Sequence, residues 1–199
     1  MYRTAIKWIA LLCILLAVAP IASAVGQEPE KKPELLTSYQ DVLEVLTDDS
    51  VLHQPNNKNQ SIRIPTKRKG SDAVMIIRWQ TNEGVISFVQ SMPMEVPEER
   101  ITSLETVMMR LNHMLAIPGF AINHANRLPY YRLVIPLHPR GGIQTNEFRL
   151  YLQLTLKHAT TFFEPLQQVA EEGADPVEVI DKILQNSKDR KAVEELPDA

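Results

Sequence analysis

The strongest constraint on the fold is the spacing of the apolar residues, which alternates along the chain between that of a β-strand and that of an α-helix. Residues 73–80 and 85–89 are rich in β-branched and aromatic side chains, and the residues between them, Thr81-Asn82-Glu83-Gly84, are typical of a turn. Residues 120–124 and 130–135 repeat this arrangement. We therefore predict two β-hairpins.

In the segments before and between the hairpins, apolar residues recur every three or four positions, as on one face of a helix. From Leu35 this spacing predicts a first helix that ends near residues 48–50. Its N-terminus is capped by one of two pairs, Thr37 with Gln40 or Ser38 with Asp41. A second helix is predicted over residues 97–115, where Pro97 takes the first helical position.

The longest helical pattern follows the second hairpin, from about Thr145 to Glu172. Pro165 lies inside it and predicts a bend there, because proline lacks the N–H of a helical hydrogen bond and crowds the preceding turn. Gly173 ends this helix. Asp175-Pro176 then begins a short helix that reaches about Leu184, and residues 187–199 are expected to fray.

One further edge strand is expected, loosely placed, within residues 51–72. The predicted order is α-β-β-β-α-β-β-α, followed by a short C-terminal helix. This order is typical of an α+β fold in which an antiparallel sheet is flanked by helices. The predicted domain spans residues 35–173, and residues 174–199 form the short helix and frayed tail.

The N-terminal residues predict a targeting segment outside this domain. Arg3 and Lys7 precede twelve uncharged residues, too few to span a bilayer, and Ala22-Ser23-Ala24 has the small residues of a cleavage site. We predict a signal peptide over residues 1–24, cleaved before Val25, and a periplasmic or secreted protein without a stable membrane span. An uncleaved anchor is the alternative. Residues 25–34 are predicted to be a disordered tether.

Composition excludes several classes of function. The one cysteine, Cys13, lies in the signal segment, so the mature chain offers no thiol catalyst, disulfide or cysteine-ligated zinc. Removal of Arg3 and Lys7 leaves 19 basic against 24 acidic residues, a formal charge of −5. We therefore expect no nucleic-acid partner and no attraction to anionic lipid.

No catalytic, metal or cofactor site emerges from the motifs, and we predict that the protein is not an enzyme. The five histidines lack the spacing that directs two imidazoles to one ion, and no nucleotide-binding or nucleophile motif is present. Lys67-Arg68-Lys69, with Arg63 nearby, is the one concentrated basic stretch. A solvated loop or an edge-strand guard is favoured there over a contact with a phosphate or a lipid headgroup.

Methionine is the less usual feature of the sequence, because six methionines lie between residues 75 and 114. Flexible thioether side chains suit binding surfaces that repack against varied partners. Met92, Met94 and Met109 are our candidate partner contacts. The alternative is that methionines fill gaps in the core, which is expected for Met75, Met108 and Met114.

Three segments carry a resemblance to a known family: Val96-Pro97-Glu98-Glu99 leading to Leu111-Asn112, then residues 118–122, then residues 130–137. Together with the element order, they resemble the YbjN family of bacterial sensory-transduction regulators, whose domains are similar in fold to type III secretion chaperones. The likeness covers roughly residues 37–170. It implies a helix-flanked sheet that binds protein segments, often as a dimer, with no catalytic centre and no functional residue to carry over.

These observations leave competing functions. The first is an exported, non-enzymatic interaction or chaperone-like module that binds a protein segment or a second copy of itself. The second is a carrier of a small apolar ligand between the long helix and the sheet, suggested by four aromatic residues: Trp79, Phe148, Phe162 and Phe163. A hydrolase is the least favoured, because nothing places a nucleophile beside a base.

Overall fold

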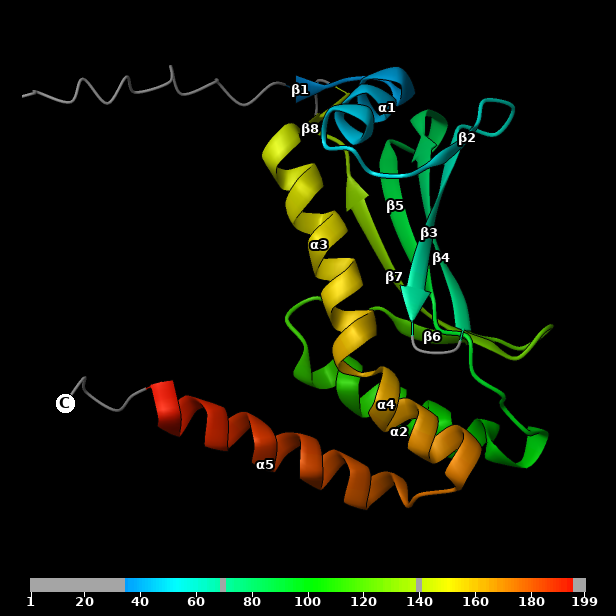
Figure 1. Ribbon diagram of the computed structural model, residues 1–199, viewed down its shortest axis with the longest axis vertical. Helices are drawn as coiled ribbons and strands as arrows, with labels where there is room; N and C mark the ends of the chain where they lie inside the picture. The colour runs from blue at the N-terminus through cyan, green and yellow to red at the C-terminus, as the bar shows by residue number, and fades with distance from the viewer. Residues whose placement is uncertain (1–34, 69–70, 139–140, 195–199) are drawn as a thin grey trace, which may run out of the picture. The chain divides into compact units, whose positions relative to one another are not determined.

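The computed structural model describes residues 35–68, 71–138 and 141–194. The predicted signal peptide (residues 1–24), the tether (25–34) and the end of the tail (195–199) lie outside these ranges. The main elements, in chain order, are β1 (Leu35–Leu36), α1 (Tyr39–Asp48), β2 (Gln54–Asn56), β3 (Ser61–Arg68), β4 (Ser71–Gln80), β5 (Val85–Ser91), α2 (Ile101–Met114), β6 (Phe120–Asn123), β7 (Leu128–Pro136), β8 (Ile143–Gln144), α3 (Thr145–Thr161), α4 (Phe163–Gln167), a π-helical turn (Gln168–Glu172) and α5 (Pro176–Glu194) (Figure 1).

Six strands form one antiparallel sheet in the order β2-β3-β4-β5-β7-β6. Both predicted hairpins are present, as β4–β5 and β6–β7. Where one edge strand was predicted the chain forms two, β2 at the edge of the sheet and β3, whose first three residues pair with β2. The predicted α+β class, an antiparallel sheet flanked by helices, is confirmed.

One face of the sheet is buried beneath helices. Helix α3 lies across β5 and β7, and α2 packs beside β6 and against α5 (Figure 1). The rings of Phe88 on β5 and Phe148 on α3 lie 5.6 Å apart at their centroids, within the range of favourable aromatic pairs. Alternate residues of the central strands contribute to this core: Ile62, Ile64, Met75, Ile77, Trp79, Ile86, Phe88, Tyr131 and Leu133.

The first helix begins later than the apolar spacing predicted. Ser38 has an extended backbone, and its hydroxyl accepts a hydrogen bond from the Asp41 N–H while the Asp41 carboxylate accepts from the Ser38 N–H. This is the second of the two predicted capping boxes. Leu35 and Leu36 precede the cap and pair as β1 with β8, so their assignment to the helix was wrong.

The long helical segment is interrupted at Phe162, three residues before the proline that predicted a bend. The carbonyl of Thr161 would accept a hydrogen bond from residue 165, and Pro165 has no N–H to donate. Helix α3 therefore ends at Thr161, and α4 follows in a new direction (Figure 1). Gly173, with φ of 74°, ends the segment as predicted.

The C-terminal helix α5 is longer than the predicted short helix and runs to Glu194. The Asp175 carboxylate accepts hydrogen bonds from the N–H groups of Val177 and Glu178, which caps the first turn. Val179 and Ile180 are buried. Beyond Leu184 the sequence has no apolar pattern, yet its Gln, Lys, Arg, Ala and Glu residues have high helix propensity, which explains the extension.

Candidate binding face of the sheet

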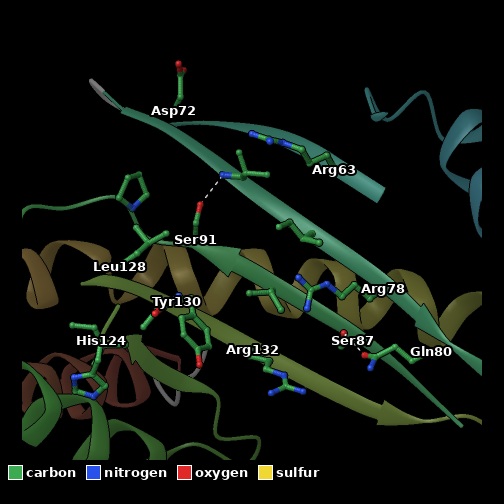
Figure 2. A pocket seen from close by; sticks show the side chains of 16 residues that line it. Arg63, Asp72, Arg78, Gln80, Ser87, Ser91, His124, Leu128, Tyr130 and Arg132 are labelled. Carbon is green, nitrogen blue, oxygen red and sulfur yellow. Dashed lines mark hydrogen bonds between the residues drawn. The ribbon is translucent and has the colours of Figure 1, made fainter. Parts of the chain in front are cut away.

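The face of the sheet opposite α3 carries a shallow depression of about 860 Å³ (Figure 2). We call this surface the open face. Its residues on β3, β4, β5 and β7 alternate along the strands with the core residues, because successive side chains of a strand point to opposite sides. The lining residues are Arg63, Asp72, Val74, Ile76, Arg78, Gln80, Ser87, Val89, Ser91, Pro93, Ile122, Asn123, His124, Leu128, Tyr130 and Arg132.

Three arginines from three different strands gather on the open face. Arg63 on β3 lies between the buried Ile62 and Ile64, and the same alternation places Arg78 on β4 and Arg132 on β7 opposite the core. All three are exposed. Figure 2 shows their side chains on the same side of the sheet.

The strand register fixes the relation between these arginines. Arg63 pairs with Ile76, Ile76 with Val89, and Val89 with Arg132, so four adjacent strands form one cross-strand row with an arginine at each end. Arg78 lies in the next row, opposite Ser87. The arginines thus surround a floor that Ile76 and Val89 make apolar.

The charge of the open face is positive. Asp72 is the one acidic residue in its lining, against three arginines. Within the part of the chain that the structure describes, two ion pairs occur, His124–Glu105 at 3.0 Å and Arg149–Asp49 at 2.7 Å. Neither involves Arg63, Arg78 or Arg132, so their guanidinium donors are available for an external anion.

The polar groups at the floor of the face bond to one another. The Ser87 hydroxyl is buried and donates to the Gln80 side-chain oxygen at 3.1 Å, and the Ser91 hydroxyl accepts from the Val74 N–H at 2.8 Å. No carboxylate or imidazole contacts either hydroxyl in these bonds. These bonds fix both side chains at the floor of the face.

The predicted contact at Met92 is wrong, because Met92 is completely buried. Its N–H donates to the Pro129 carbonyl at 2.9 Å, which continues the β5 ladder by one residue. The strand alternation that places Ser91 on the open face therefore turns Met92 into the core.

The other candidate methionines lie apart from the open face. Met94 is half-buried, one residue beyond Pro93 at the margin of the depression. Met109 is 68% exposed on α2 and lines a separate hollow of about 440 Å³ with Met114, Ile180, Arg110 and His113. Met75 and Met108 fill the core as expected, whereas Met114 is 40% exposed and does not.

The basic stretch at the end of β3 lies on a partly unpaired strand edge. β2 pairs with only the first three residues of β3, so the remainder of that edge has no neighbouring strand in the described residues. Pro65 and Lys67 are exposed there, and both residue types disfavour pairing with another chain. This supports the edge-guard interpretation of the stretch, although Lys69 lies outside the described residues.

A partly buried polar cluster lies between β7 and α3. The Tyr131 hydroxyl donates to the Ile117 carbonyl at 2.8 Å and lies 2.8 Å from Nδ1 of His158. Burial raises the pKa of Tyr131 to about 12. Burial, and secondarily the charge of Lys157, lowers the pKa of His158. The cluster ties β7, α3 and the segment before β6 together and is not part of the open face.

The space between α3 and the sheet, where an apolar ligand was the alternative prediction, is occupied by side chains. Phe148 and Trp79 are buried in the core. Phe162 packs edge-on against Phe120, with centroids 5.5 Å apart. Phe148 thus packs against Phe88 and Phe162 against Phe120, so these side chains fill the core between α3 and the sheet.

The described ranges contain no group of three or more His, Cys, Asp or Glu side chains placed to hold a metal ion. None of their helices is both long enough and apolar enough to cross a bilayer.

Sequence reasoning missed the arginine arrangement, although a signal was present. Arg63, Arg78 and Arg132 each interrupt a run of strand-forming apolar residues at the alternating position. A charged residue at such a position indicates the solvent face of a strand. The sequence does not reveal the strand register, and it is the register that brings the three arginines together.

Comparison with known proteins places the fold. Residues 41–168 match the YbjN family, described as "Putative bacterial sensory transduction regulator". Among solved structures, the chain is similar to one described as "Crystal structure of YbjN, a putative transcription regulator from E. coli", with 12% sequence identity and a TM-score of 0.52. That likeness covers 66% of this chain and 93% of the other and shows the fold alone. No curated protein matches the chain. Because the family match spans more than half of its residues, the chain belongs to the YbjN family.

Proposed function

We propose that this protein is a non-catalytic regulatory module that acts by binding a segment of another protein on the open face of its sheet. The family description as a sensory transduction regulator supports a regulatory role. The single observation that carries the proposal is a sheet face that no element of the described residues covers, with its depression lined from β3, β4, β5 and β7 (Figure 2).

The composition of the open face suits a protein partner. Interfaces combine an apolar centre with a polar rim, and arginine is enriched in them. Here Ile76 and Val89 are half-buried at the centre, while Arg63 and Arg132 are exposed at the two ends of their row. The depression is shallow, as expected for a surface that receives a segment of chain rather than an enclosed small molecule.

A photo-crosslinking experiment tests this proposal. A benzophenone amino acid is incorporated in place of Val89 on the open face, and irradiation of living cells is followed by mass spectrometry of the crosslinked peptide. Because the photoreactive group lies on the proposed surface, we expect one recurrent partner segment to be crosslinked at this position. Matched proteins carry the group in place of Leu150, which is 57% exposed on α3, or in place of Met109 on α2.

The two matched positions decide the outcome. Adducts at position 89 that are absent at position 150 support binding on the open face. Adducts confined to position 109 would move the partner surface to α2, where Met109 was predicted to make contact. Equal labelling at all three positions would mean random collision and would contradict the proposal.

We also propose that the protein works outside the cytosol, in a chaperone-like manner. Arg3, Lys7 and the cleavage sequence Ala22-Ser23-Ala24 support export. Cell fractionation with N-terminal sequencing tests this: the mature protein is expected in the periplasm or medium, beginning at Val25. A protein that stays in the cytosol with its first 24 residues intact would contradict export while leaving the binding proposal in place.

A further inference from the structure

We infer that the segment bound on the open face is acidic and extended, with two carboxylates separated by an apolar side chain. This inference rests on the proposed function and specifies the chemistry of the partner. It is carried by the three exposed arginines and by the apolar residues between them.

The spacing of the row supports an extended segment that crosses the strands. Arg63 and Arg132 stand at the ends of a row of four strands, hence three strand spacings, or about 14 Å, apart. In an extended chain, residues i and i+4 lie on the same side and are also about 14 Å apart. Acidic side chains at i and i+4 can therefore reach Arg63 and Arg132.

The middle of such a segment faces the apolar floor. Residue i+2 points the same way as residues i and i+4 and lies over Ile76 and Val89. An apolar side chain at i+2 would cover these half-buried residues. Arg78, in the neighbouring row, is available to a further carboxylate or to the backbone carbonyls of the segment.

Charge argues for an anionic partner independently of the spacing. The whole chain has a formal charge of −3, yet its open face carries three arginines and one acidic residue. Arginine forms paired hydrogen bonds with a carboxylate, and its weak hydration lowers the cost of leaving water.

A single-stranded nucleic acid is the other anionic polymer to consider. Such ligands are bound by aromatic side chains on which the bases stack. The open face has one tyrosine, Tyr130, in its lining, but no Phe or Trp, and the residues between Arg63 and Arg132 in the row are the aliphatic Ile76 and Val89. The open face therefore favours an acidic peptide.

The test is selection of a random twelve-residue peptide display library on the purified protein at low salt. Because the face carries unpaired cations at a fixed spacing, we expect enrichment of Asp or Glu at positions i and i+4, with an apolar residue at i+2. A synthetic peptide of the selected consensus should bind less tightly as salt is raised.

Variants then locate the interaction. Arg63→Gln and Arg132→Gln should each weaken binding of the consensus peptide by about two- to fivefold, and the triple variant that adds Arg78→Gln by about tenfold or more. Arg110→Gln is the matched control, because Arg110 is exposed on α2 and lines the separate methionine hollow. It should leave the affinity unchanged.

The failures of the two proposals can be told apart. Selected peptides without acidic excess that still lose binding on Val89→Glu would overturn the acidic inference and leave the open face as a binding surface. Peptides whose binding ignores every open-face substitution would overturn both proposals. The labelled consensus peptide can also be displaced with an oligothymidine or with unlabelled peptide. If the oligothymidine displaces it at the lower concentration, the ligand is a nucleic acid and the inference is overturned.

Discussion

One side chain, that of Asn112, makes hydrogen bonds with the backbone groups at the start of β6. Asn112, on α2, accepts hydrogen bonds through Oδ1 from the N–H groups of Gly119 and Phe120, at 2.9 and 2.8 Å. Its Nδ2 donates to the Phe120 carbonyl at 2.8 Å. The Asn112 amide thus bonds to the backbone at the start of β6 as a neighbouring strand would, and it holds β6 against α2.

Replacing Asn112 should therefore destabilise the fold. Asn112→Ala removes three hydrogen bonds and leaves half-buried backbone groups without partners, for an expected loss of about 2–3 kcal/mol in the free energy of unfolding. Urea denaturation measures it. Asn82→Ala is the control, because Asn82 is exposed in the β4–β5 turn, and it should cost at most about 0.5 kcal/mol. Equal losses in the two variants would refute the bridging role.

The pair of His158 and Tyr131 makes stability depend on pH. Burial lowers the pKa of His158 in the folded state below its ordinary value of about 6.5, so the unfolded chain binds the proton more readily. The neutral imidazole of His158 therefore makes its full contribution to the free energy of unfolding above about pH 6.5. This contribution is lost as the pH falls through the lowered pKa. The free energy of unfolding should decrease over that acidic range.

Comparison of two histidine variants isolates this effect. His158→Gln should flatten the pH dependence of the unfolding free energy between neutral and mildly acidic pH. His138→Gln should preserve it, because His138 is exposed. If the unfolding free energy has the same slope against pH in the wild-type protein and in His158→Gln, another group causes the acid sensitivity.

At the scale of elements, close approaches of the backbone decide where strands begin. A Cβ atom at Gly119 would collide with the carbonyl oxygen of Arg132 and lie 2.8 Å from the Tyr131 ring. The Gly119 carbonyl also accepts the Arg132 N–H at 2.8 Å. Only glycine allows β6 to begin this close to β7.

Gly119→Ala should therefore weaken the β6–β7 hairpin specifically. We expect a loss of about 2–3 kcal/mol in unfolding free energy, together with faster hydrogen exchange of the Arg132 amide. Gly84→Ala is a useful comparison, because its added methyl would meet no atom within 4 Å and only the positive φ of 64° opposes it. That variant should cost about 1 kcal/mol and leave exchange at Arg132 unaltered. The steric argument fails if Gly84→Ala proves the more damaging change.

The elements that sequence predicted well are those determined locally. The turn residues 81–84 and the alternation on both sides specified the β4–β5 hairpin, and the capping pair of Ser38 and Asp41 placed the start of α1 as one of two alternatives. β1 and β8 were missed because two residues carry no detectable period, and their pairing joins distant parts of the chain. The interruption at Phe162 was misplaced because the missing N–H of Pro165 affects the preceding turn.

At the scale of the whole folded domain, the helices that the structure describes lie on one face of the sheet and leave the open face without a covering element among the described residues. Alternation within a strand indicates which residues can avoid the core, but not that Arg63, Arg78 and Arg132 converge. Their convergence depends on the strand order β3-β4-β5-β7 and on its register, which are tertiary properties. Met92 was misassigned for the related reason that β5 alternation continues one residue past the strand.

Methyl NMR of the purified protein, titrated with the display-selected peptide, tests most directly whether the open face is the binding surface. The account predicts that the methyl signals of Ile76 and Val89 shift progressively, while those of Met109 and Met114 on α2 stay in place. Shifts confined to Met109 and Met114, with Ile76 and Val89 unchanged at saturation, would contradict it.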